Sequence, residues 1–411
     1  MGARPPAREA ARPPVRLIAG LALGATLLGV AGCGDDPAGE QAFDTKIALY
    51  VGVPLRGPWG QQGQAIMNGA RLAIADSGGG AGTYSVRLTI RDVTDDNGVD
   101  VGAQGASREA GTALRDQGAI AMVGGLDPVS VRQLALLGGQ TGLSFVSASG
   151  DQVDDSTADL SPRGRRLFVE LAARDRAIGE QLGARARAAG CRRTTLLAVG
   201  YGARRTAALQ SQLGAGTTTV GAGRFTLRTD PRAVDPALVA TTRRALRRDR
   251  GCVVVAAEPS AGDPAVLLRP LAGQLRGRTL LLTRGAASQG VADLARSAGI
   301  DAQAIVDDLA ADSDAETRRI DRLWRATYRT PLPVGAIAGW RSVKLVLRAV
   351  AAAGGRGNWR RDVADALVKV PVPGPPAEGR QDPDGTVTPA PVGLARPMAA
   401  GWRVVENLSD R

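Results

Sequence analysis

Repeated alternation of short apolar runs with longer amphipathic segments constrains the fold of this chain more than any other feature. KIALYVGV (46–53) is followed by a helical pattern over residues 61–77, and YSVRLTIRD (84–92) and AIAMVGG (119–125) each precede a further helical pattern. Strands that alternate with helices of about ten to fifteen residues are typical of a parallel, doubly wound α/β sheet. We therefore expect an α/β fold in which the carboxyl ends of several strands meet at one edge.

The alternation restarts in the second half of the chain, where RTTLLAVGYG (193–202) and CVVVAAEPS (252–260) are each followed by helical patterns. This restart predicts a second α/β lobe, connected to the first by a hinge, with a ligand cleft at the carboxyl ends of the strands. The expected boundaries are a first lobe over 46–163, a second lobe over 164–308, a return to the first lobe with a crossover over 309–391, and a C-terminal strand over 392–411 that returns to the second lobe.

The N-terminus indicates where the protein is located. A basic leader precedes the apolar run Leu17 to Ala31, whose 15 residues are fewer than the ~20 that span a bilayer as a helix and suit a signal peptide. The run ends in VAGC, which resembles a bacterial lipobox with Cys33 as the lipidated first residue of the mature chain. Residues 1–32 are then the signal peptide and 33–45 a flexible tether. The alternatives are an ordinary secretory signal or a chance cysteine. We expect an extracytoplasmic, lipid-anchored protein.

Composition and missing motifs limit the chemistry. The formal charge is +12 and aromatic residues make up 3%, but the arginines are scattered, which favours a solvated surface over a nucleic-acid groove. The chain has no histidine, no pair of CxxC motifs and no phosphate-binding loop, which removes the Ser-His-Asp arrangement and most zinc sites. We expect a binding protein, not an enzyme, with no cofactor and no metal.

Cys191 and Cys252 are the only other cysteines, and each precedes or begins an apolar run. If these runs are neighbouring parallel strands, both cysteines lie at the same end of the sheet, and an exported compartment permits a disulfide between them. The alternative is two buried free thiols.

Several segments together resemble periplasmic-type solute-binding proteins of branched-chain amino acid ABC transporters. GPWGQQGQAIMNGARLAI (57–74), MVGGLDPVS (122–130), FVSASGD (145–151), GYG (200–202) and the late helical region over 323–354 occur in the family's order and spacing. The resemblance implies the two-lobed type I fold of these proteins. It also implies that a hinge closes on an amino acid, whose carboxylate lies at helix N-termini in lobe one and whose ammonium lies beside an acid and aromatics in lobe two.

The resemblance also implies site residues, and several of them depart from the family pattern. In lobe one the first hydroxyl contact falls at Pro128, with Ser130 two residues later, and the second falls at Ser149 and Asp151. The usual aromatic contact falls at Gln62, for which Trp59 is a candidate substitute.

In lobe two Tyr201 is retained, but the usual ammonium-binding acid falls at Arg284, and Glu258 either replaces it or pairs with Arg284. One hypothesis is a pocket of partly inverted charge, formed by Asp127, Asp151 and Arg284, for a reversed zwitterion, an amide or a carboxylate. The alternative is that these three side chains point to solvent at the cleft rim.

The sequence therefore predicts a monomeric, lipid-anchored solute-binding protein that captures an amino acid or related small polar solute and delivers it to an ABC permease. The alternative function is a sensor or co-receptor without a transport role. Nucleic acid is not an expected partner.

Overall fold

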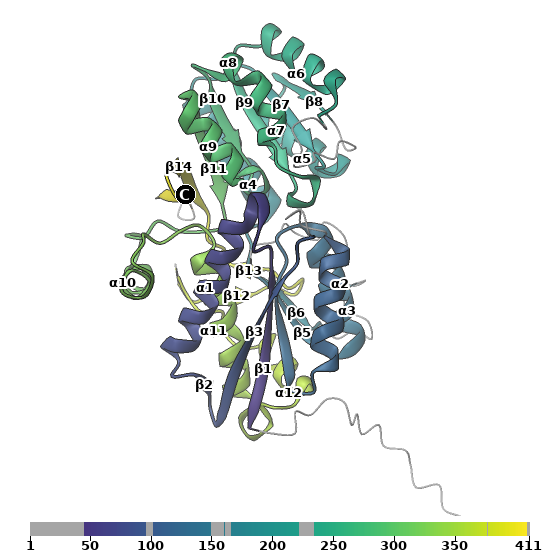
Figure 1. Cartoon of the computed structure of the whole chain (residues 1–411), viewed down its shortest axis with the longest axis vertical. Coiled ribbons are helices and arrows are strands. Elements are labelled where there is room, and N and C mark those ends of the chain that lie inside the picture. Colours follow the sequence, from purple (N-terminus) through teal and green to yellow (C-terminus); the bar gives the residue numbers. More distant parts are fainter. Residues whose placement is uncertain are drawn as a thin grey trace, which may run out of the picture. The chain divides into compact units, whose positions relative to one another are not determined.

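The computed structural model describes residues 45–95, 102–148, 160, 166–221, 234–375 and 377–408. Residues 1–44, with the leader, Cys33 and nearly all of the expected tether, lie outside the described residues, as do Ser149 and Asp151. Within the described part, the chain forms two lobes, each with its own sheet covered by helices (Figure 1). No helix in that part is both long and apolar enough to cross a membrane.

The first lobe has a six-stranded sheet, parallel except for one short edge strand. In spatial order its strands are β2 (Gly80–Ala81), β3 (Tyr84–Asp92), β1 (Lys46–Val53), β4 (Ala119–Gly124), β5 (Ser144–Ser147) and β6 (Phe168–Glu170). β4 and β5 are buried along their whole length, and β1 is buried beyond Lys46. Burial on both faces explains why these runs are continuously apolar instead of alternating.

Five helices belong to this lobe, and a sixth lies beside it. They are α1 (Gly60–Asp76), α2 (Ala103–Arg115), α3 (Pro128–Thr141), α11 (Ala336–Ala352) and α12 (Arg360–Leu367), with α10 (Ala315–Tyr328) set apart (Figure 1). α1 and α11 approach closely because each has a glycine at the contact. A Cβ added at Gly69 would lie 2.1 Å from the carbonyl oxygen of Ala336, and one at Gly339 would lie 2.0 Å from that of Ile66.

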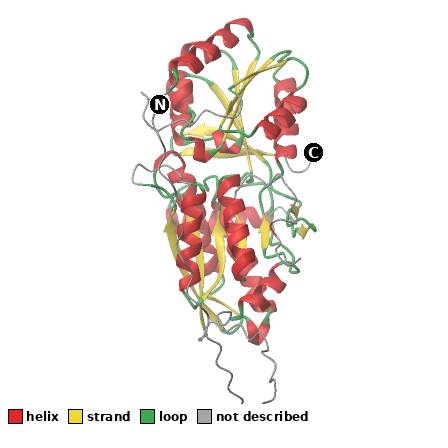
Figure 2. Cartoon of the chain, turned by 90° about the vertical axis from the view of Figure 1, so that its right-hand side faces the viewer, coloured by secondary structure: helices red, strands yellow, loops and turns green. Residues whose placement is uncertain are grey.

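The second lobe has a seven-stranded sheet, and Figure 2 shows helices packed around it. In spatial order its strands are β15 (Gly401–Asn407), β14 (Gly393–Met398), β11 (Asp301–Val306), β10 (Thr279–Leu282), β9 (Cys252–Ala257), β7 (Thr194–Val199) and β8 (Thr217–Val220). Only β14 and β15 run antiparallel to their neighbours. The helices are α4 (Asp175–Ala188), α5 (Ala203–Leu213), α6 (Pro236–Arg248), α7 (Ala265–Leu268), α8 (Ala272–Leu275) and α9 (Gln289–Ala298).

The chain crosses between the two sheets after β6, after β11 and before β14. β6 pairs with β5, Phe168 lying opposite Phe145, so the first sheet extends beyond the expected boundary at residue 163. After β11 the chain returns to the first lobe through α11 and α12, and a small hairpin of β12 (Arg380–Gln381) and β13 (Val387–Thr388) follows. β14 and β15 then join the second sheet through β11.

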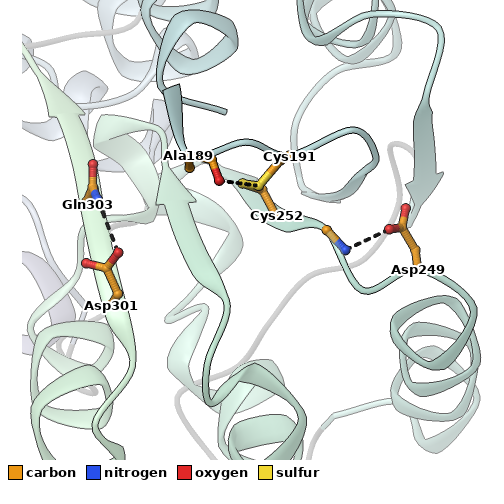
Figure 3. Close-up of a disulfide and its surroundings, with 7 residues drawn as sticks. Ala189, Cys191, Asp249, Cys252, Asp301 and Gln303 are labelled. Carbon is orange, nitrogen blue, oxygen red and sulfur yellow. Dashed lines mark hydrogen bonds between the residues drawn. A yellow bond between two sulfur atoms is a disulfide. The ribbon is translucent and has the colours of Figure 1, made fainter. Parts of the chain in front are cut away.

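Cys191 and Cys252 form a disulfide (Figure 3). Cys252 begins β9 and Cys191 lies just before β7, and the two strands are neighbours in which Thr194 is opposite Cys252. Their Cα atoms are 5.6 Å apart, within the usual range for a disulfide. The bond ties the helix α4 to the start of the central strands of the second lobe.

Candidate ligand-binding site

One small cavity is lined by residues from both lobes. The lining residues of the first lobe are Pro58, Trp59, Gln61 and Gln62. Those of the second lobe are Arg284, Ala287, Gln289, Val306, Ala400, Gly401 and Trp402. The connection before α11 contributes Pro333 and Val334. The cavity volume is about 40 Å³, which is room for about three water molecules. The carboxyl ends of parallel strands are where α/β sheets bind ligands, and Val306 ends β11.

Trp59 lies in a tight turn between β1 and α1. Gly57, at φ +72°, and Pro58 begin a single 3-10 turn over Gly57–Trp59 that leads directly into α1. The chain before this turn can approach α1 closely because residue 63 is a glycine. A Cβ at Gly63 would lie 1.7 Å from the carbonyl oxygen of Pro54. The Trp59 side chain is buried, and its indole Nε1 donates no hydrogen bond within the described structure. Trp59 therefore lines the cavity and carries a buried donor that has no partner among the described residues.

Arg284 is buried, with 4% of its surface exposed, and is not a solvated rim residue. Its guanidinium group forms an ion pair with Asp307 at the end of β11, and a longer one, 3.4 Å, with Asp175. It also donates to the carbonyl oxygen of Ala173 at 3.2 Å. No sequence pattern predicts Asp307 or Asp175 as partners of Arg284, because they lie 23 and 109 residues away from it in the chain.

Tyr201 and Glu258 are brought together by Arg205, which the sequence analysis did not select. The Arg205 guanidinium carbon lies 4.0 Å from the centre of the Tyr201 ring, a cation–π arrangement. The same group pairs with Glu258 at 2.7 Å and with Asp175. Glu258 thus pairs with Arg205. Because Asp175 contacts both arginines, the lobe-two residues form one connected ion network.

The N-terminus of α3 is capped by Asp127, which has no exposed surface. Asp127 Oδ1 accepts hydrogen bonds from the backbone N–H groups of Val129 and Ser130, at 2.9 and 3.1 Å, and Oδ2 accepts from the Ser130 hydroxyl at 2.5 Å. A carboxylate at a helix N-terminus is favoured by the helix dipole. The chain's own Asp127 thus fills the place where the resemblance puts a ligand carboxylate. Asp127 is not at a solvated rim.

Ser130 faces a second, smaller cavity of about 10 Å³, beneath the carboxyl edge of the first sheet. The same cavity is lined by Glu109 of α2, whose two carboxyl oxygens are buried and accept no hydrogen bond from the described residues. Burial raises the pKa of Glu109 to about 8, so this side chain is a neutral acid at pH 7. Nothing in the sequence pattern of α2 marked it.

No protein-family model and no curated protein sequence matches the chain. Its structure, however, is similar to solved structures of solute-binding proteins. These include a leucine-binding protein from Thermotoga maritima (TM-score 0.70, 13% identity, 88% of this chain and 98% of the other). A solute-binding protein of an ABC transporter from Rhodopseudomonas palustris, solved with p-hydroxybenzoic acid, has TM-score 0.68 and 17% identity over 88% and 97% of the two chains.

A branched-chain amino acid transporter substrate-binding protein from Streptococcus pneumoniae, solved with isoleucine, has TM-score 0.66 and 16% identity over 88% of this chain and 99% of the other. At these identities the likeness concerns the fold, and it extends over nearly the whole of each relative. The alternating strand and helix pattern, the two sheets and these comparisons agree: the chain has the two-lobed fold of type I periplasmic solute-binding proteins.

Proposed function

We propose that this protein is an extracytoplasmic, lipid-anchored solute-binding protein that captures a small polar solute between its lobes and delivers it to an ABC permease. The observation that supports this most directly is the cavity that Trp59 and Gln62 of the first lobe share with Arg284 of the second. The solved structures with a similar fold include a leucine-binding protein and proteins solved with benzoate or isoleucine. A sensor without a transport role remains the alternative function.

The cavity volume of about 40 Å³ is below the roughly 300 Å³ at which small-molecule pockets begin. A solute therefore requires the lobes to separate at the cavity before it enters. Two-lobed binding proteins achieve this by a hinge movement, in which a few connecting residues absorb the change. Pro333 and Val334, which line the cavity and lie in the connection before α11, are candidates for this role.

The class of solute is inferred from the charged side chains of the expected site, which already have partners within the chain. Asp127 is engaged with the N-terminus of α3, and Glu258 is engaged with Arg205. Arg284 is engaged with Asp307. A free amino acid in the family's pose would have to displace these contacts, and breaking a buried charge pair costs about 3–5 kcal/mol. We propose an uncharged polar solute, such as an amide, whose carbonyl oxygen accepts from Trp59 Nε1.

A thermal-shift screen of the protein against amides, amino acids and small carboxylates tests this proposal. We expect amides to raise the melting temperature, and Trp59→Phe, which removes the donor but keeps an aromatic ring, to abolish the shift. Trp359→Phe is the matched control, since Trp359 lies at the N-terminus of α12 and does not line the cavity. If amino acids alone raise the melting temperature, the solute class is wrong. If no compound does, solute capture loses its support.

The proposed transport role is tested separately, by identifying the proteins that the neighbouring genes encode. A permease and an ATPase encoded there would favour delivery to a transporter, and a membrane receptor in their place would favour sensing. Radiolabelled palmitate incorporation that is lost in Cys33→Ser would support the lipid anchor, and unchanged incorporation would contradict it.

A further inference from the structure

β15 leaves one edge of the second sheet uncovered. It is the last strand in the sheet order and pairs only with β14 among the described strands. An edge strand carries backbone N–H and C=O groups that can pair with another extended segment. A groove of about 530 Å³ is lined by Arg403, Val404 and Val405 of this strand. Consecutive residues have side chains on opposite faces of a sheet, so a groove that contacts all three follows the edge of the strand.

The opposite wall of this edge groove is helix α10, which lies apart from the other helices in Figure 1. Arg318, Arg322 and Arg325 of α10 line the groove. Their spacing of four and three residues places them on one face of the helix. With Arg403 on the strand, four guanidinium groups surround the groove, against the two carboxylates of Asp312 and Asp321.

These charges are only partly used by the chain itself. Arg325 pairs with Asp321 at 2.7 Å, and Arg318 donates to the carbonyl oxygen of Asp312 at 3.1 Å. No hydrogen bond or ion pair with another described residue engages the guanidinium groups of Arg322 and Arg403. The other oxygen of Asp321, Oδ1, is buried and accepts no hydrogen bond from a described residue. The groove is therefore lined by two arginines that have no partner among the described residues, Arg322 and Arg403.

An apolar groove adjoins the edge groove. Its volume is about 420 Å³, and it shares Pro331, Leu332 and Arg403 with the edge groove. Trp324 of α10 and Trp402 of β15 also line it. Contiguous apolar surface beside a charged rim is typical of a protein interaction site.

We propose that this surface binds an extended, acidic segment of a partner protein, which adds a strand to the free edge of β15. Backbone hydrogen bonds to β15 hold the segment, acidic side chains pair with the arginines of α10, and an apolar side chain enters the adjoining groove. None of the four arginines lines the solute cavity, whereas the adjoining apolar groove shares Gln61, Pro333, Ala400 and Trp402 with it.

The test uses a fluorescein-labelled peptide of alternating glutamate and valine, seven residues long, with blocked ends, and measures its anisotropy with the full chain. We expect saturable binding that weakens as salt is added. The double variant Arg318→Glu/Arg322→Glu should weaken binding by about tenfold or more, because it reverses two rim charges. The matched control is Arg244→Glu/Arg248→Glu, which has the same spacing on the exposed face of α6 and should leave binding within about twofold.

Two further measurements separate strand addition from simple charge attraction. The same peptide with N-methyl groups on alternate residues keeps its charges but loses backbone donors, and we expect it to bind far more weakly. Bound peptide should also slow hydrogen exchange of the β15 amides over 401–407. Equal binding of the N-methylated peptide, of a lysine–valine peptide, or by the Arg318→Glu/Arg322→Glu variant would overturn the proposal. So would binding of phosphatidylglycerol vesicles without peptide binding, or self-association of the chain through the same edge.

Discussion

Glu109 makes the stability of the first lobe depend on pH. Its side chain is 2% exposed, and neither carboxyl oxygen accepts a hydrogen bond from the described residues. Gly52 provides the space it occupies, since a Cβ at Gly52 would lie 1.6 Å from Glu109 Oε2. Burial raises the pKa from 4.5 to about 8, and the Arg91 charge lowers it only in part.

The direction of the effect follows from proton binding. Between pH 4.5 and about 8, the folded chain keeps the Glu109 proton while the unfolded chain has released it. The free energy of unfolding therefore falls as pH rises through this window, and it is flat below and above it. At 1.36 kcal/mol per pKa unit, the whole loss is about 5 kcal/mol, and about 3 kcal/mol of it has occurred by pH 7.

Glu109→Gln keeps the shape of the side chain and does not titrate. We expect the difference in the free energy of unfolding between the variant and the wild type to change by about 5 kcal/mol from pH 4 to pH 9, in favour of the variant at high pH. Urea titration at several pH values measures it. Asp308, whose pKa burial raises to about 7, acts in the same direction but is present in both proteins, so it cancels.

Glu180→Gln is the matched control, because the Glu180 side chain is 55% exposed on helix α4. This variant should follow the wild-type pH profile. A wild-type profile that Glu109→Gln leaves unchanged would refute the reasoning, since it would mean that Glu109 is already ionised in the folded protein.

Three further predictions concern stability alone. The double variant Cys191→Ser/Cys252→Ser should lose about 4 kcal/mol of unfolding free energy in oxidising buffer, from the loop entropy of a bond that spans 61 residues, while added reductant should affect only the wild type. Gly339→Ala should lower the melting temperature, because its Cβ meets backbone at 2.0 Å, and Gly273→Ala, where the space is open, should not. Asp307→Asn should cost about 3 kcal/mol by leaving the buried Arg284 guanidinium group with the more distant Asp175 carboxylate in place of its closer charged partner, and a variant as stable as the wild type would contradict the network.

The fold followed from the sequence because it depends on patterns that are local along the chain. The continuous apolar runs of β1, β4 and β9 distinguish buried parallel strands from half-exposed ones. The disulfide could be proposed as one of two alternatives for the same reason. If β7 and β9 are neighbouring parallel strands, Cys191 and Cys252 lie at the same end of the sheet. β6 was missed as a strand because it has only three residues.

The site was predicted only as far as single positions go. The family resemblance implied Trp59, Gln62 and Arg284 as site residues, and all three line the one cavity, while their role in binding stays a prediction. The partners of Arg284 and Tyr201 were not predictable, because Arg205, Asp175 and Asp307 reach the site from different elements. A pairing between side chains on separate elements depends on rotamers and distances that no local pattern encodes.

Asp307 of the lobe-two ion network and its neighbour Asp308 bind the backbone of segments that connect the two lobes. Asp307, the residue after β11, accepts a hydrogen bond at 2.9 Å from the backbone N–H of Ala173, just before α4. The next residue, Asp308, accepts from the N–H of Gly335 at 2.7 Å, at the start of α11 in the first lobe. Adjacent carboxyl groups thus accept hydrogen bonds from two of the three described connections between the lobes. The lobe movement proposed above would have to keep these two hydrogen bonds or break them, and breaking the one at Asp307 would take a donor from a buried carboxylate, which is costly.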